Sequence, residues 1–200
     1  MRVLSVIFGA AAIWVAMAPP IAMLDHRMLT AHMEQHLLLM TIAPPLLWLG
    51  APVPKKRLPL PVCWIPAALV LIAWHVPAVF RVGMESSPWH VAEQLSFLAS
   101  GLLFWWPVFQ TPPRWSILLY LFLATLPCDA LSGFLVFSDR IAYPVYLCVR
   151  SRDAGWVLGD QQCAGALMWT AVTIVYLVAG TVLAMQLLSA QPHECPAEAV

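Results

Sequence analysis

Two histidines spaced four residues apart are the first feature of this chain that could do chemistry. His32 and His36 have this spacing in a stretch that is typical of a helix. On a helix the two imidazoles share one face, about 6 Å apart along the axis, and Met40 continues the same stripe. His-xxx-His is a common spacing of metal ligands, whereas a histidine at a membrane surface can also be solvated among lipid headgroups. Both interpretations stay open for this pair.

Soft donor groups elsewhere in the chain extend this candidate site. Imidazole, thioether and thiol ligands suit copper or zinc better than magnesium or calcium. Each residue also has an ordinary structural role: methionine and cysteine fill apolar cores, and His75, two residues before Pro77, could bond carbonyls at a helix end. The predicted metal ligands are His32, His36, His75, His90, Cys128, Met40 and Met168.

Three acids and an amide are predicted to support these ligands. Glu93 follows His90 by three residues at a helix start, where it either favours the helix dipole or accepts a hydrogen bond from a ligand imidazole. Asp129 is expected on the order of 12 Å below the membrane surface, where a carboxylate is expensive without a partner. Glu93 and Asp129 would orient the ligands or carry displaced protons. The predicted supporting residues are Glu93, Asp129, Asp160 and Gln161.

The composition excludes several functional classes. Of the 200 residues, 62% are hydrophobic and 10% are charged, with a mean hydropathy of +0.80. Soluble proteins carry roughly a quarter charged residues, so this chain must use membrane lipid as part of its solvent. Its zero net charge and the lack of a large basic patch exclude nucleic-acid binding. Because the sequence has no Gly-rich loop and no nucleophile-base motif, we do not expect an enzyme.

Charge-free stretches mark the elements that must position the candidate residues. A spanning helix needs about 20 apolar residues, and open strands or loops cannot satisfy their backbone groups in lipid. Six stretches qualify, and the fifth is interrupted only by Asp129. We therefore expect a single all-α domain, a polytopic membrane helical bundle with a polar tail at 189–200. The predicted transmembrane spans are about 3–18, 29–50, 60–80, 89–109, 115–137 and 161–188.

Prolines affect the interpretation of the first two predicted spans, at the end of the first and inside the second. The Ala-Met-Ala segment at 16–18 ends an apolar run that also resembles a cleavable signal peptide, although Pro19 makes an awkward cleavage site. Pro44 and Pro45 should kink the second span unless neighbouring groups satisfy the carbonyls that they free.

The orientation follows from the cations near the span ends. Lys55, Lys56 and Arg57 form the densest group and favour their side as cytoplasmic. Both chain ends then face the cytoplasm, and the candidate ligands, which gather at the other ends of the spans, face outwards. On an oxidising outer side, Cys148 and Cys163 could form a disulfide.

Five segments, in their order and spacing, resemble the polytopic CtaG family of bacterial cytochrome c oxidase assembly factors. The combination of His-Met-x-Gln-His, Trp-His-x-Pro and Asp-Gln-x-x-Ala-Gly carries the resemblance, which extends over roughly 30–185. The segments are HMEQHLLLMTIAPPLLWLG (32–50), AWHVPAVF (73–80), WHVAEQLSFLASGLLFWWPVF (89–109), LSGFLVFSDRIAYPVY (131–146) and DQQCAGALMW (160–169).

The resemblance implies a role in maturing a copper-containing haem-copper oxidase, at the outer face of the bacterial cytoplasmic (inner) membrane. Two departures stand out. The family often has a histidine near the end of the fifth span, where this chain has Cys128 and Asp129, and many members have seven spans. The family motif positions present here are His32, His36, His75, His90, Glu93, Asp160 and Gln161.

Residues and resemblance together predict a membrane-embedded factor that holds copper, as Cu(I), and passes it to a cytochrome c oxidase subunit by ligand exchange. Copper would be held among His36, His75 and His90, with His32, Cys128 or a methionine as a further ligand. Two alternatives stay open: a b-type cytochrome whose facing histidines ligate haem, and a metal-free scaffold whose histidines hydrogen-bond between helices. A homo-oligomer is also compatible with the sequence.

Overall fold

The computed structural model describes residues 2–149 and 153–189, and all regular elements within them are helical. The predicted all-α fold is therefore confirmed. In chain order the elements are α1 (Arg2–Met17), α2 (Pro19–Leu24), α3 (Leu29–Leu37), a π-helix (Leu38–Ile42), α4 (Ala43–Gly50), α5 (Leu60–His75), α6 (Pro77–Glu85), α7 (Ser87–Trp105), a 3-10 helix (Trp106–Phe109), α8 (Ser116–Phe137), a second 3-10 helix (Pro144–Cys148) and α9 (Ala154–Ser189).

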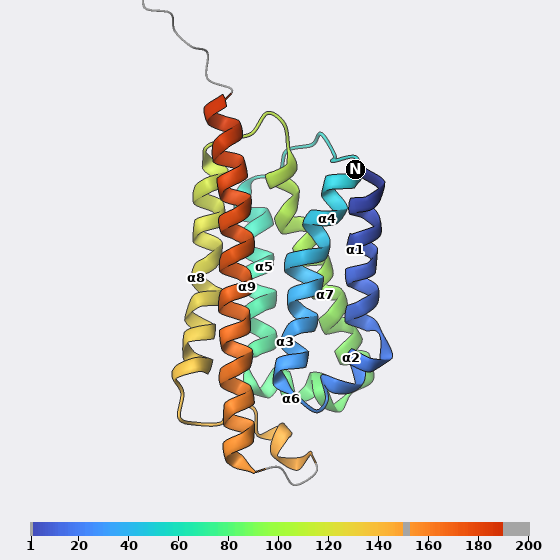
Figure 1. Ribbon diagram of the computed structural model, residues 1–200, viewed down its shortest axis with the longest axis vertical. Coiled ribbons are helices and arrows are strands. Elements are labelled where there is room, and N and C mark those ends of the chain that lie inside the picture. Colours follow the sequence, from blue (N-terminus) through green and yellow to red (C-terminus); the bar gives the residue numbers. More distant parts are fainter. Residues whose placement is uncertain (1, 150–152, 190–200) are drawn as a thin grey trace, which may run out of the picture.

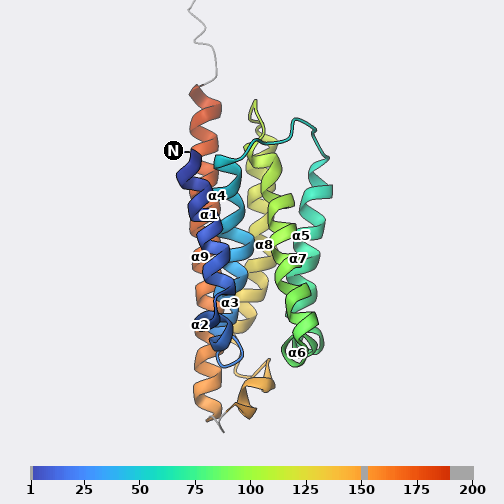
Figure 2. The same cartoon turned by 90° about the vertical axis from the view of Figure 1, so that its right-hand side faces the viewer.

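The long helices lie side by side along one axis and form a bundle (Figures 1 and 2). The start of α1 and the end of α9 lie at the same end, drawn upwards in Figure 1. The short helices α2 and α6 and the 3-10 helix Pro144–Cys148 lie towards the opposite end, called the lower end here. The chain therefore crosses the length of the bundle several times and returns to the end where it began.

When helix length and composition are the criteria, fewer described helices qualify as membrane spans than the sequence predicts. Within the described residues, α8 and α9 are long and apolar enough to cross a membrane, and α5 with α6 passes only when the two are taken as one bent pair. These apolar helices fit a membrane protein, but six spans are not confirmed. The shortfall has local reasons: α1 has 16 residues, and a π-helix divides the segment 29–50.

The third predicted span does not continue to residue 80. His75 ends α5 and Pro77 begins α6, with the two axes bent by 77° at this break. Val76 between them is extended, with ψ at 123°. The residue before a proline is pushed out of the helical conformation by the proline ring. The prediction of one helix over 60–80 is therefore corrected to two, with the bend directly after His75.

The second predicted span keeps its helical course through Pro44 because another helix supplies the missing donor. Pro44 has no N–H for the carbonyl of Met40, four residues earlier. The indole Nε1 of Trp105 on α7 donates to that carbonyl at 3.1 Å. A Cβ at Gly101 would lie 2.7 Å from the same oxygen, so the glycine lets α7 approach the π-helix closely. The expected kink is thus replaced by a π-helical turn that is bonded to α7.

An aromatic core joins α7, α8 and α9. The ring of Phe104 stacks on Tyr120 and Tyr176, with centroids 4.9 and 5.6 Å apart. The hydroxyl of Tyr120 also donates to the carbonyl of Phe104 at 2.8 Å. These contacts join the three helices where α7 ends and α8 begins.

Two further predictions concern the second half of the chain. Cys148 and Cys163 are both free and exposed, so the structure does not form the disulfide considered from the sequence. The predicted polar tail at 189–200 lies outside the described residues except for Ser189, which ends α9.

Replacing Trp105 with Phe tests the bond to the π-helix. The Met40 carbonyl loses its donor, and leaving a buried acceptor unpaired costs about 1–3 kcal/mol. We expect W105F to lower the thermal unfolding midpoint in detergent. The matched control is W106F, because the indole of Trp106 donates to Pro54 O in an exposed position. Equal stabilities of the two variants would contradict this role for Trp105.

Candidate metal centre

Four histidines come together at the lower end of the bundle. His32 and His36 lie one turn apart on α3, His75 is the last residue of α5, and His90 lies in the first turn of α7. Glu93 follows one turn after His90, so its carboxylate faces the same space. Ring centroids are 4.3 Å apart for His32 and His36 and 5.8 Å apart for His36 and His75. The structure therefore gathers all four predicted imidazoles, on three helices, within one region.

Glu93 lies at the centre of this group. Its Oε1 is 3.3 Å from Nε2 of His32 and 3.3 Å from Nε2 of His36, and all three residues are buried. Among the described residues, neither carboxylate oxygen of Glu93 and none of the four ring nitrogens has a hydrogen-bond partner. Because buried polar groups nearly always have partners, these unpaired atoms require an explanation. Two imidazoles and a carboxylate this close are a ligand set for a transition-metal ion.

Close packing holds these three side chains in place. The ring of His36 stacks on Phe97 with centroids 3.9 Å apart, and Phe80 meets the ring of His32 edge-on at 4.8 Å. A Cβ at Gly83 of α6 would lie 3.0 Å from Oε2 of Glu93, so α6 covers the carboxylate closely. Among the described residues, no lysine or arginine forms an ion pair with Glu93. Within the part of the chain that the structure describes, its charge can be balanced by imidazoles, or by a cation that they would bind together.

His75 has a fixed tautomer that leaves Nε2 free to act as a ligand. Its Nδ1 is 2.7 Å from the carbonyl of Leu71, and a carbonyl only accepts, so Nδ1 carries a proton. In the neutral ring Nε2 then has a lone pair, and it lies 3.2 Å from the sulfur of Met33. Two lone-pair atoms therefore face each other without a proton between them.

A small buried cavity adjoins His36 and His75. Its volume is about 50 Å³, and soft donor groups gather around it. Cys128 enters from α8, where its sulfur lies 3.8 Å from the hydroxyl of Ser132. The donor residues that line the cavity are Met33, His36, Met40, His75, Cys128 and Met168. The structure thus brings the predicted soft ligands together around His36 and His75 and adds Met33.

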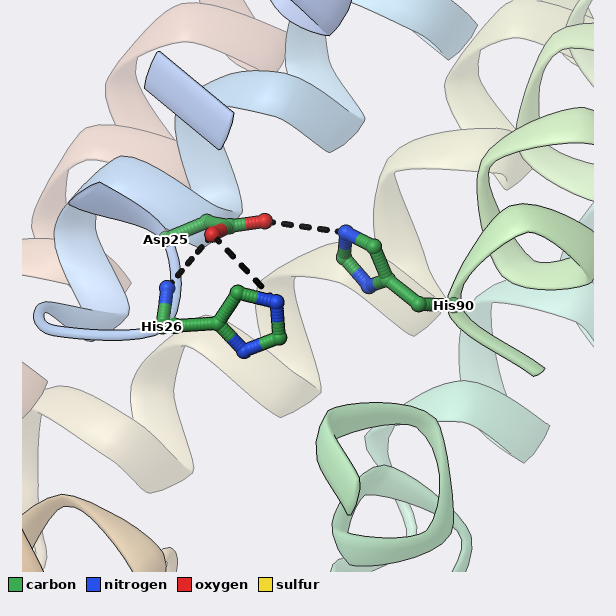
Figure 3. A group of neighbouring side chains, drawn as sticks. All are labelled: Asp25, His26 and His90. Atoms are coloured by element: carbon green, nitrogen blue, oxygen red, sulfur yellow. Dashed lines mark hydrogen bonds and ion pairs between the residues drawn. The ribbon is translucent and has the colours of Figure 1, made fainter. Parts of the chain in front are cut away.

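His90 belongs to a second cluster further towards the lower end, with two residues that the sequence analysis missed. Nε2 of His90 is 2.9 Å from Oδ2 of Asp25, and Nε2 of His26 is 3.9 Å from Oδ1 (Figure 3). Asp25 is fully buried in the turn between α2 and α3. The available signal was the Asp-His dipeptide shortly before the His-xxx-His pair. His90 also remains linked to the first cluster, with Nδ1 3.4 Å from Oε2 of Glu93.

Two tyrosines of the loop before α9 hold the backbone of this region. Tyr146 donates its hydroxyl to the carbonyl of Asp25, and Tyr143 donates to the carbonyl of His75, each at 2.9 Å. Burial raises the pKa of both phenols, so they stay protonated and act as donors. The loop therefore fixes the turns that carry Asp25 and His75.

Asp160 and Gln161 support the fold around the histidines instead of touching their rings. The Asp160 carboxylate accepts the N–H groups of Leu29 and Thr30 at 2.6 and 3.4 Å, and the Thr30 hydroxyl at 2.6 Å. It therefore caps the start of α3 from another helix, where a negative charge also favours the helix dipole. Gln161 accepts the N–H of Ala142 at 2.7 Å and holds the loop after α8.

Asp129 is separated from the histidines. Its side chain lines a groove on the face of α8 and α9, with Trp169 and Tyr176 among its neighbours. Cys128, the adjacent residue, points to the opposite side and reaches the buried cavity. The structure therefore gives no support to Asp129 as a residue that orients the ligand imidazoles.

The sequence as a whole matches one known family. The model of the cytochrome c oxidase caa3 assembly factor (Caa3_CtaG) family matches the chain in two overlapping segments, residues 1–64 and 57–190. The chain belongs to this family. Among curated proteins and solved structures there is no significant match. Membership confirms the resemblance seen in the motifs, and an assembly role implies interaction with cytochrome c oxidase and suggests a non-catalytic protein.

Replacing Asp160 with Ala separates the capping role from metal binding. We expect D160A to destabilise the folded protein by about 1–2 kcal/mol, because α3 loses the acceptor for its first N–H groups. The midpoint of thermal unfolding should fall, while the copper bound per chain stays unchanged. D129N is the control, since Asp129 lies on the outer groove of α8 and α9. A copper loss in D160A without a stability loss would restore Asp160 to the metal site.

Proposed function

We propose that the chain is a membrane-embedded assembly factor that binds copper as Cu(I) and helps to load it into a cytochrome c oxidase. Family membership supports the assembly role, and the buried cavity supports the metal. The single observation that carries the proposal is the gathering of two imidazoles, three thioethers and a thiol around one cavity of about 50 Å³. These are the ligand types that Cu(I) prefers.

The ligand set proposed here omits two histidines of the set expected from the sequence, His32 and His90, and adds Met33. His36 and His75 both line the cavity, whereas His90 lies with Asp25 outside it. Met33 takes the place of His90, because its sulfur already lies 3.2 Å from Nε2 of His75. Met40, Met168 and Cys128 are the further candidates, since all three line the same cavity. Cu(I) would thus be held mainly by neutral ligands within an apolar surrounding.

His36 connects this cavity to the cluster around Glu93. Its ring lines the cavity, while its Nε2 also lies 3.3 Å from Glu93 Oε1. In the proposed mechanism this contact with Glu93 orients the His36 ring, and loss of the contact frees Nε2 to ligate copper. Release would then proceed by ligand exchange towards the oxidase subunit, with the thioethers as weak, replaceable ligands. We place this exchange at the outer face of the inner membrane.

Two features favour a copper-binding assembly factor over a b-type cytochrome and over a metal-free scaffold. Pockets for drug-sized ligands measure about 300–1,000 Å³, so a cavity of about 50 Å³ suits an ion better than a porphyrin. A metal-free scaffold would use its histidines as hydrogen-bonding groups. Within the described residues, Nε2 of His32 and Nε2 of His36 approach Glu93 at 3.3 Å, but the ring nitrogens have no aligned hydrogen-bond partner, which such a role would require.

Replacing His36 and His75 together with Ala tests the metal assignment. We expect about one copper per chain in protein purified in detergent after growth with added copper, no Soret band, and loss of the copper in the H36A/H75A variant. Metal analysis and a visible spectrum measure both. Unchanged copper in the variant defeats the ligand assignment, and a Soret band in the wild-type protein favours a cytochrome.

A thioether substitution tests the cavity itself. Met168 lines the cavity from α9, whereas Met185 on the same helix is 57% exposed. M168L keeps the apolar volume but removes the sulfur, so we expect Cu(I) affinity to fall roughly tenfold, the scale of losses at metal-site neighbours. M185L should leave the affinity unchanged. Competition with a coloured Cu(I) chelator under reducing conditions provides the measurement, and equal affinities would exclude Met168 as a ligand.

A further inference from the structure

The cluster of Asp25, His26 and His90 differs chemically from the cavity proposed for Cu(I). It offers two imidazoles and one carboxylate and no sulfur ligand (Figure 3). Nitrogen and oxygen ligands of this kind suit divalent transition ions such as Cu²⁺ or Zn²⁺, whereas Cu(I) prefers sulfur. One ligand atom from each residue lies within 4.8 Å of the other two. This spacing fits three ligands around a single ion.

Among the described residues, two atoms of this cluster lack a hydrogen-bond partner. Asp25 is fully buried, and its Oδ2 lacks a hydrogen-bond partner although His90 Nε2 is only 2.9 Å away. The two atoms therefore approach each other without the alignment of a hydrogen bond. Nδ1 of His90 is likewise unpaired. A buried carboxylate is expensive unless a cation compensates its charge, and at this position the cation is either a protonated His90 at 2.9 Å or a bound metal ion.

The cluster is held in position by its surroundings. The Asp25 carbonyl accepts the hydroxyl of Tyr146, and Oδ1 accepts the backbone N–H of His26. Gln94, one turn after His90, places its side-chain amide nitrogen 2.8 Å from Nε2 of His90. The Asp25 carboxylate is thus set by groups around it, whereas an ion bound at His90 Nε2 would displace the Gln94 amide from that nitrogen.

The cluster is open to solvent on the side of His26. The His26 side chain is 46% exposed, whereas Asp25 is fully buried and His90 is 11% exposed. The rings of His26 and His90 lie 5.1 Å apart by their centroids, so the exposed ring sits directly over the buried part of the cluster. An ion arriving from outside the bundle would meet His26 first.

We propose that Asp25, His26 and His90 form a second metal site, for a divalent transition ion, that is separate from the Cu(I) cavity and open to solvent at the lower end of the bundle. Among such ions Cu²⁺ should bind most tightly. The site does not depend on the Cu(I) proposal, because it shares no ligand with the cavity. Its link to the interior is His90, whose Nδ1 is 3.4 Å from the Glu93 carboxylate.

The test adds Cu²⁺ alone to the purified full-length protein after metal removal and records electron paramagnetic resonance spectra. For the wild type we expect a signal whose hyperfine pattern reports two imidazole nitrogens. H26Q should reduce the pattern to one nitrogen and weaken Cu²⁺ binding at least tenfold. Because His26 is half exposed, this substitution leaves the packing of the bundle intact. D25N should weaken binding while the two nitrogens remain, and its unfolding midpoint checks the fold.

The matched control is E34Q, which changes an exposed residue of the neighbouring helix α3 and should leave spectrum and affinity unchanged. A Cu²⁺ signal that is the same in H26Q and E34Q would overturn the proposal and assign the ion to other histidines. The Cu(I) proposal is judged separately, under reducing conditions. H26Q should retain Cu(I) there, and H36A/H75A should lose Cu(I) but keep the Cu²⁺ signal.

Discussion

The carboxylate of Glu93 is the group on which the lower end of this structure depends. A buried carboxylate in an apolar bundle costs several kcal/mol unless opposite charges or donors surround it. Here three imidazoles approach it, from α3 and from its own helix α7, and no described lysine or arginine forms an ion pair with it. Helix α6 closes over the same group, with glycine at the contact point. The bend after His75 is what brings α6 to this position.

The second constraint is the contact between the π-helix and α7. Two neighbouring prolines remove donors from the middle of a helical segment, and the wider π turn together with the Trp105 indole compensates for this loss. The same turn carries Met40, whose carbonyl bonds to α7 while its side chain lines the cavity. The feature that stabilises the irregular helix thus also places a soft donor beside His36. Met40 therefore takes part both in stabilising the π-helix and in lining the candidate copper site.

The lower end changes in chemical character with depth. Sulfur and neutral imidazole surround the buried cavity, a carboxylate between imidazoles follows, and a second carboxylate with an exposed histidine lies nearest to solvent. This order is compatible with the proposed transfer of a metal ion, because each environment favours a different ligand number and charge. Tyrosines of one loop donate hydrogen bonds to the backbone at Asp25 and at His75, and these bonds hold the clusters in fixed positions relative to each other.

The sequence by itself determined the helical class, the membrane character, the family and the gathering of histidines at one end, because composition and residue spacing are local properties. Tertiary structure decided the partners. In the folded chain His90 contacts Asp25, and Met33 contacts His75. Asp160 caps the start of α3, whereas Asp129 lies in a groove on the outside of α8 and α9. The chain also bends at Val76, within an apolar segment that the sequence predicts to be one continuous helix. Helix rotation and packing set these outcomes, and they follow from contacts between distant segments that no residue spacing contains.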